Sequence, residues 1–443
     1  MPTPPTSTRE QDGRRVAKLT LSAAPTAAEG RHQLTVTAAS GALEDEATLE
    51  LEVASLTVRG RVTGTYGYPL VHVPVASQGD SEVSDLNGEF ELTGLAVRYD
   101  VTMWDAANGS YFAFEGLTAS EVVLGTNVTP NGAFSRSTTV KGTLTPQPVG
   151  PDDFVLVCPE GLDGPALGCF TYTSLDTEFT VPVAWVGRTN RQLRLHLLGV
   201  QSDDGATPDG YTGYATVDVD LAHGVPAELD ETVDLGDPLQ TRTVDVQVES
   251  SDPVSIVISG LRLAPGLTVS VGAVAGTSSV SSTVPVIPGA SYSFLAGTGG
   301  GLAWVADVTE DAVSFAIPDV PSLESPPSGV EGVTLDTEFE VTGAGDAALL
   351  WNWSAVGPTY QLSRTTVDPS TTMPDGSEAG MALPAATSFA WQAVSVGDGA
   401  EGAASAVYNL NAFLALILSS GSTGFVGDGH YVIAGSDTFT TAP

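Results

Sequence analysis

Apolar and polar residues alternate regularly between Leu56 and Asp105, and this alternation predicts four short strands. A period of two turns successive side chains to opposite faces, so each strand should bury one face. The apolar residues that share a face in the four runs are Val58 and Val62, then Val71, Val73 and Val75, then Phe90 and Leu92, and last Tyr99, Val101 and Met103. Gly, Asn and Asp in segments 78–80 and 85–88 favour tight reversals between the runs. Because Pro74 has no N–H to donate, its strand is expected at an edge or with a bulge.

Five short motifs in this stretch are Val58-x-Gly60-x-Val62, Pro69-Leu70-x-x-Val73-x-Val75, Ser84-Asp85-x-x-Gly88-x-Phe90, Leu92-x-Gly94-Leu95 and Tyr99-x-Val101. Their order resembles the carboxypeptidase regulatory-like domain, a small transthyretin-like β-sandwich that is common in bacterial surface proteins. Ser84 stands where that family more often has threonine. The resemblance extends over residues 56–137. It implies a scaffold module without catalytic residues, in which the Asp-x-x-Gly-x-Phe motif is a turn that enters a strand.

Similar alternating runs recur along the chain, and abundant Gly, Thr, Ser, Val and Pro favour strands and turns over helices. The expected fold class is all-β, with tandem antiparallel β-sandwich domains of the Ig-like or transthyretin-like kind. Val140-x-Gly142 repeats the Val58-x-Gly60 start and opens the next unit. The expected organisation is a flexible terminus at 1–15, a partial Ig-like β unit at 16–55, the carboxypeptidase regulatory-like domain at 56–137, a β-sandwich with a cysteine loop at 138–239, a β-sandwich at 240–325, and an Ig/fibronectin-III-like domain at 326–443.

Two stretches leave alternatives open. Residues 16–55 hold three alternating runs, which are too few for a sandwich. They are either the last strands of an Ig-like domain whose front half lies upstream of Met1, or strands that pair with the next domain. Asn409–Ser420 is either a buried strand or a short helix in a sheet crossover.

The formal net charge is −37, and Lys18 and Lys141 are the only lysines. A surface this acidic repels nucleic-acid backbones and anionic lipids, so neither is expected as a main partner. It suits an extracellular or high-salt setting, although solubility alone would also account for it. The apolar run Ala412–Leu418 is far below the ~20 residues of a membrane-spanning helix. Met1–Pro5 lacks the basic start and apolar run of a signal peptide, so export would require a leader that begins upstream.

Cys158 and Cys169 are the only cysteines, and a short loop separates them. A disulfide that closed this loop would contribute about 3 kcal/mol in the loop-entropy model. We expect the two to be bonded, which implies an oxidising compartment and therefore an extracellular or cell-surface location. The alternative is a pair of reduced, buried thiols. Two thiols without a neighbouring histidine cannot form a typical four-ligand zinc site.

No catalytic or cofactor constellation stands out, so we predict that the chain is not an enzyme and needs no cofactor. Gly-x-Ser-x-Gly is absent, and the segment around Ser291 lacks the second glycine. The five histidines, at positions 32, 72, 196, 223 and 430, are scattered along the chain. Asp203, Asp204 and Asp209 cluster in a Gly/Pro-rich loop that can bind Ca²⁺ weakly, although solvated turn carboxylates are the commoner explanation.

Trp104 lies on the polar side of its predicted strand, and Tyr66 and Tyr68 lie in a loop beside Pro69. Exposed aromatic rings suit sugar stacking, and the competing explanation is packing between domains or under a loop. The expected function is a non-catalytic structural or adhesion role at the cell surface or in secreted form. The alternatives are a polysaccharide-binding module and an accessory part of a larger secreted enzyme. The expected partner is a protein or a polysaccharide at the cell surface.

Overall fold

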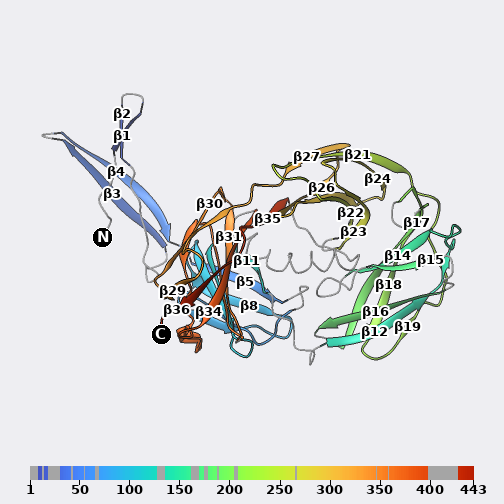
Figure 1. Cartoon of the computed structure of the whole chain (residues 1–443), viewed down its shortest axis with the longest axis horizontal. Helices are drawn as coiled ribbons and strands as arrows, with labels where there is room; N and C mark the ends of the chain where they lie inside the picture. Colours follow the sequence, from blue (N-terminus) through green and yellow to red (C-terminus); the bar gives the residue numbers. More distant parts are fainter. Residues whose placement is uncertain are drawn as a thin grey trace.

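The computed structural model describes residues 8–11, 14–17, 30–40, 43–53, 55–64, 69–126, 135–160, 169–173, 178–186, 189–203, 208–264, 267–345, 347–357, 359–397 and 428–443. The all-β prediction is confirmed, because the described residues form strands and a single 3₁₀ turn, η3 (Ser377–Ala379). None of the described elements is a helix long and apolar enough to cross a membrane. Four sandwich units follow one another along the chain, coloured from light blue to red in Figure 1.

The first unit confirms the strands expected between Leu56 and Asp105 and adds others. Its strands are β5 (Leu56–Thr63), β6 (Pro74–Ser77), β7 (Asp80–Val83), β8 (Glu89–Leu95), β9 (Tyr99–Asp105), β10 (Ser110–Leu117) and β11 (Glu121–Gly125). They form two layers, β11-β5-β8 and β7-β6-β9-β10, and the predicted apolar residues other than Val71 belong to the core between the layers. The expectation that the strand of Pro74 is an edge or carries a bulge is wrong, because β6 pairs with β7 on one side and β9 on the other without a register shift. Pro74 is instead the first residue of β6, a position where proline is tolerated.

The second and third units repeat the strand order of the first. The second unit contains β12 (Ser135–Gly142), β13 (Leu144–Thr145), β14 (Phe154–Glu160), β15 (Phe170–Thr173), β16 (Phe179–Val186), β17 (Asn190–Gln201), β18 (Gly210–Ala222), β19 (Ala227–Glu228) and β20 (Val233–Asp234). The third contains β21 (Thr241–Glu249), β22 (Ile256–Ala264), β23 (Leu267–Ala275), β24 (Ser279–Pro285), β25 (Ser291–Gly297), β26 (Gly301–Val308) and β27 (Ala312–Ala316). In each unit the opening strand lies at the centre of a three-stranded layer, parallel to a strand near the end of the unit, as β5 is to β11, β12 to β19 and β21 to β27.

The shared Val-x-Gly start has a physical cause in the first two units. Gly60 of β5 lies opposite Phe90 of β8, and Gly142 of β12 lies opposite Phe179 of β16. A Cβ atom added to Gly60 would lie 2.1 Å from the Phe90 ring, and one added to Gly142 would lie 2.6 Å from the Phe179 ring. Each buried ring therefore occupies the space that a side chain on the opposite strand would fill, a known way of stabilising a glycine within a sheet.

We predict that Gly60→Ala lowers the free energy of unfolding by about 1–3 kcal/mol, the usual cost of overpacking a core. Phe90→Leu in the same chain should recover part of that loss, because the smaller side chain vacates the contact. Urea unfolding of the parent, both single variants and the double variant forms a double-mutant cycle that measures the coupling. Additive effects of the two substitutions would contradict direct contact between Gly60 and Phe90.

The last unit is built around an aromatic core. Its strands are β28 (Ser322–Ser325), β29 (Val330–Val333), β30 (Glu338–Thr342), β31 (Ala348–Ala355), β32 (Gln361–Thr366), β33 (Ser370–Thr372), β34 (Ser388–Val396), β35 (Gly429–Ile433) and β36 (Asp437–Thr441). The indole of Trp351 lies nearly parallel to those of Trp353 and Trp391, and Phe339 meets the latter two edge-on. All three of these tryptophans are buried.

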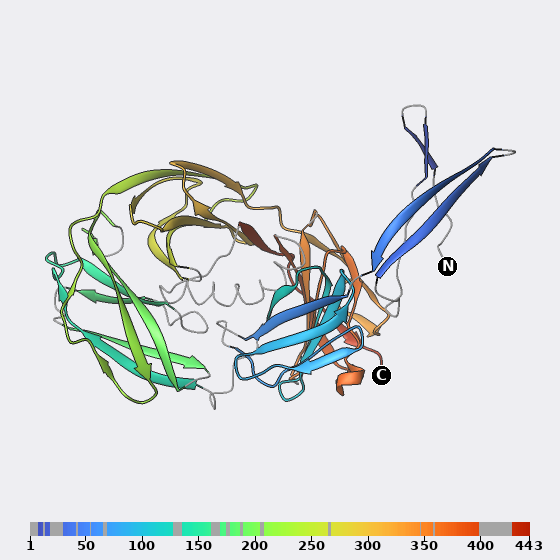
Figure 2. The same cartoon turned by 180° about the vertical axis from the view of Figure 1, so that it is seen from behind.

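One sheet runs through three of the four units. Its strand order is β23-β22-β25-β26-β35-β34-β31-β32-β10-β9-β6-β7, and β36 and β29 attach to it beside β34. Two ladders cross unit borders: β10 pairs with β32 in parallel, and β26 pairs with β35 in antiparallel. Figures 1 and 2 show this continuity from the third unit, in yellow, through the last, in orange and red, to the first, in light blue.

Two hairpins precede the sandwiches. β1 (Thr8–Gln11) pairs with β2 (Arg14–Ala17), and the hairpin begins inside the stretch 1–15 expected to be a flexible terminus. β3 (Gly30–Ser40) and β4 (Leu43–Val53) pair with each other along their whole lengths and extend away from the sandwiches in Figure 2. Among the described residues these two strands form a ribbon and not a sandwich. The third expected run, at Leu19 and Leu21, lies outside the described residues, as does Asn409–Ser420.

Candidate functional site

Trp104 lies where the first unit meets the last. It is half-buried in β9 and packs against the aromatic core of the last unit, next to Tyr111 of β10. This position matches the domain-packing alternative weighed for Trp104, and sugar stacking by the exposed part of its ring stays a prediction. Tyr66 and Tyr68 lie outside the described residues.

Cys158 and Cys169 are joined by a disulfide, as predicted. Cys158 lies in β14, Cys169 directly precedes β15, and both are buried. Their sulfurs belong to a core cluster that also contains Leu198 and Tyr211 of the second unit and the valines of β21. The disulfide therefore lies in the apolar layer between the second and third units.

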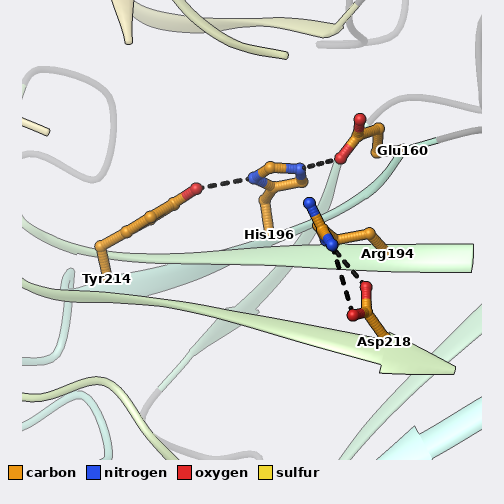
Figure 3. Close-up of polar contacts among 5 residues, drawn as sticks. All are labelled: Glu160, Arg194, His196, Tyr214 and Asp218. Atoms are coloured by element: carbon orange, nitrogen blue, oxygen red, sulfur yellow. Dashed lines mark hydrogen bonds and ion pairs between the residues drawn. The ribbon is translucent and has the colours of Figure 1, made fainter. Parts of the chain in front are cut away.

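A polar network covers the part of this β14–β17–β18 face that lies beyond the apolar layer (Figure 3). The registers place three rows across the face: Glu160, Arg194 and Asp218, then Cys158, His196 and Thr216, then Leu156, Leu198 and Tyr214. Directly opposed side chains of neighbouring strands interact most closely, so each row is a unit of contact. From the first row to the third, the face changes from three charged residues to two leucines and Tyr214, with His196 in the row between them.

His196, in the middle row, contacts one residue in each of the other two rows. Its side chain is 4% exposed, with Nε2 2.7 Å from Glu160 Oε2 and Nδ1 2.7 Å from the Tyr214 hydroxyl. Both ring nitrogens thus have a partner, which a buried imidazole requires. Beside it, Arg194 donates from Nε to Asp218 Oδ1 over 2.8 Å, in a pair whose two side chains are about half exposed. The ionised guanidinium of Arg194 holds the pKa of Asp218 below its usual value, chiefly through this hydrogen bond.

The order carboxylate, imidazole and hydroxyl in Glu160, His196 and Tyr214 is that of a proton relay to a nucleophile. The environment of Tyr214 opposes that chemistry. Burial raises the pKa of its phenol, and the charge of Glu160 raises it further, with Arg194 acting in the opposite direction. A nucleophile needs the reverse shift. The network therefore serves to satisfy polar atoms beneath the unit border and to fix the orientation of His196.

We predict that Tyr214→Phe lowers the free energy of unfolding by about 1–2 kcal/mol, because Nδ1 of a buried imidazole loses its partner. Asp218→Asn should have a much smaller effect, since its ion pair with Arg194 is exposed to solvent. Chemical denaturation of both variants, followed by circular dichroism, measures the difference. Equal effects would contradict the structural importance of the Tyr214 contact.

Two depressions lie on the surfaces of the first and second units. A depression of about 730 Å³ lies over β5, β8 and β11 and is lined by charged residues including Arg59, Arg61 and Glu91. A second, of about 540 Å³, lies along β12 and β16 beside Gly224. No group of three or more potential metal ligands occurs among the described residues, which include Asp203 and Asp209 but not Asp204. Asp209 accepts a hydrogen bond from the Asp203 N–H, an ordinary loop contact.

Comparisons with known proteins give only distant likenesses. No protein-family model and no curated protein sequence matches the chain. The open conformation of the pilus adhesin SpaC from Lactobacillus rhamnosus GG is 11% identical, and the match covers 70% of this chain and 51% of the adhesin at a TM-score of 0.15. The Bacillus anthracis TIE protein is 11% identical over 71% of this chain and 67% of its own, with a TM-score of 0.15. A streptococcal ancillary pilin is 8% identical over 59% of this chain and 99% of its own, with a TM-score of 0.16. At such TM-scores these likenesses support no further statement about the chain.

Proposed function

We propose that the chain is a non-catalytic structural and adhesion protein at the cell surface or in secreted form. The observation that carries this proposal is the sheet shared by three units. Ladder hydrogen bonds across unit borders make the units one scaffold, whereas domains on flexible linkers move independently. Such a scaffold holds loops and edge strands at fixed separations, which suits binding of a protein or polysaccharide over a broad surface.

The disulfide and the charge support the compartment in this proposal. Disulfides form and persist in oxidising surroundings, and a net charge of −37 keeps an exported protein soluble. The division at 56–137, 138–239, 240–325 and 326–443, with a carboxypeptidase regulatory-like first domain, belongs to the same proposal. Its support is the strand order repeated in the first three units.

Protease treatment of intact cells of the source organism tests the location. We expect the protein to be cleaved on intact cells or recovered from the medium, with both cysteines unreactive towards thiol reagents until reduced. A protein confined to the cytosolic fraction with two free thiols would refute the proposal. A glycan array addresses the partner: retention on a defined polysaccharide, lost in Trp104→Ala, would favour the polysaccharide-binding alternative.

A further inference from the structure

Strand β8 forms one edge of the layer β11-β5-β8. The carbonyl of Gly88, the residue before β8, accepts from Val62 N–H over 2.8 Å. From there, residues of β8 that hydrogen-bond to β5 alternate with residues that do not. In an antiparallel pair alternate residues direct their backbone groups away from the partner strand. The N–H groups of Glu89, Glu91 and Thr93 therefore point to the open edge, where an added strand would bind.

Side-chain oxygens from the neighbouring hairpin occupy this edge. The donor and acceptor pairs are Glu89 N–H with Asp85 Oδ1 at 2.8 Å, Glu91 N–H with Glu82 Oε2, Thr93 N–H with Asp80 Oδ2 at 2.7 Å, and Ala96 N–H with Gln78 Oε1 at 2.9 Å. We call the side chains of Gln78, Asp80, Glu82 and Asp85 the acceptor ladder. Acceptors with higher residue numbers pair with donors that have lower residue numbers, as in two antiparallel strands. The acceptor ladder thus replaces the carbonyls of a missing strand.

The acceptor ladder is titratable, unlike a backbone ladder. Three of its four members are carboxylates, and in ionised form each accepts strongly from an N–H. Among the described strands, β7, which carries two of them, pairs through its backbone only with β6. Protonation of the carboxylates weakens the acceptors, and no described strand pairs with this edge of β8 to keep it covered.

We propose that β8 is a self-association edge, closed by the acceptor ladder at neutral pH and released in acid to pair antiparallel with β8 of a second copy. Charge identifies the second copy as the occupant. Each chain carries a net charge of −37 with an isoelectric point near 4.1, so mutual repulsion disappears over the acid range in which the carboxylates protonate.

The register of such a pair is self-complementary. A two-fold axis through Glu91 sets Glu91 opposite Glu91 of the second copy and Glu89 opposite Thr93. Two ionised glutamates directly opposed across a ladder are destabilising, and two protonated ones are not. The protonation that opens the acceptor ladder therefore also removes the local repulsion at the new contact.

The charged groups around this edge set the pH range. Arg59 of β5 donates to Glu91 at 2.8 Å, Arg61 donates to the Asn87 carbonyl at 3.0 Å, and Glu121 of β11 lines the same depression as Glu91. The Thr93 N–H lowers the pKa of Asp80. Because the folded-state pKa lies below the unfolded value near ~4, the contribution of Asp80 to stability is complete above that value and is lost as the pH falls through the folded pKa. Release is thus expected below about pH 4.

Sedimentation velocity over a range of concentrations tests the proposal with two ways of opening the edge. The parent should be monomeric at pH 7 and dimeric at about pH 3.5. Asp80→Ala/Glu82→Ala should dimerise already at pH 7 in about 0.5 M NaCl, where charge is screened, at least about tenfold more tightly than the parent. Asp152→Ala/Asp252→Ala removes the same charge from exposed sites elsewhere and should remain monomeric.

Thr93→Pro provides the specific block, because it deletes an N–H that faces the open edge and leaves the β5 ladder intact. It should abolish both the acid dimer and the dimer of the alanine variant. Circular dichroism and the melting temperature confirm that each variant is folded, and Asp80→Asn/Glu82→Gln replaces the alanine pair if that pair unfolds. A ladder variant that stays monomeric, or an acid dimer that survives Thr93→Pro, would overturn the proposal.

Discussion

Reduction of the Cys158–Cys169 disulfide is expected to lower the free energy of unfolding of the second unit by about 3 kcal/mol. The loop between the cysteines is short, at a sequence separation of 11, and opening it returns that entropy to the unfolded chain. Both sulfurs also lie in the cluster that joins the second unit to the third. The loss should therefore extend beyond β14 and β15 to the border with β21 and β24.

Differential scanning calorimetry with and without reductant measures this effect. A loss of about 3 kcal/mol corresponds to a fall in melting temperature of about 12–24 °C for a unit of this size. Cys158→Ser/Cys169→Ser should melt at the lower temperature in both buffers, which separates loss of the disulfide from other effects of the reductant. Hydrogen exchange should rise in β14 and β15 and stay unchanged in β31 and β34 of the last unit. An unchanged melting temperature after complete reduction would contradict this account.

Alternation in the sequence predicts the strands that bury one face. The runs at Val58, Phe90 and Val101 become β5, β8 and β9, because strict alternation of apolar and polar residues indicates a strand with one buried face. Strand β7 was missed, since Asp80, Ser81 and Glu82 have no apolar face to reveal it. Its side chains serve β8 as hydrogen-bond acceptors, a role that leaves no hydrophobic pattern.

Alternation does not predict which units contact one another, although continuous apolar runs mark two of the strands at unit borders. Phe154–Cys158 in β14 and Tyr111–Phe114 in β10 are continuous apolar runs, which indicate strands covered on both faces. One face of each strand packs against its own unit and the other against a different unit. Which unit covers the second face depends on how the whole chain packs. For the same reason His196, which alternates in sequence with Leu195 and Leu197, is buried beside the border between the second and third units, and Trp104 is half-buried at the border between the first and last.

Gly109→Ala is expected to separate the first unit from the last. Gly109 has φ +60°, and its carbonyl accepts from Gln361 N–H over 2.8 Å at the start of the β10–β32 ladder. A Cβ atom there would lie 2.1 Å from the carbonyl oxygen of Thr359, a backbone atom that cannot rotate away. The substitution must therefore push β32 off β10. It should cost about 1 kcal/mol of backbone strain and about 2 kcal/mol more for the displaced ladder.

Gly94→Ala is the matched control, because Gly94 of β8 has φ +71° and a Cβ atom there meets nothing within 4 Å. It carries the same backbone strain without touching another unit. In calorimetry we expect the first and last units of the parent and of Gly94→Ala to melt in one transition, and those of Gly109→Ala in two. The Arg364–Glu115 ion pair, 3.3 Å across this border, should then contribute nothing, so Glu115→Gln would destabilise the parent but not the Gly109→Ala chain. If both glycine variants melt alike, the shared sheet does not couple the units, and the scaffold proposal loses its main support.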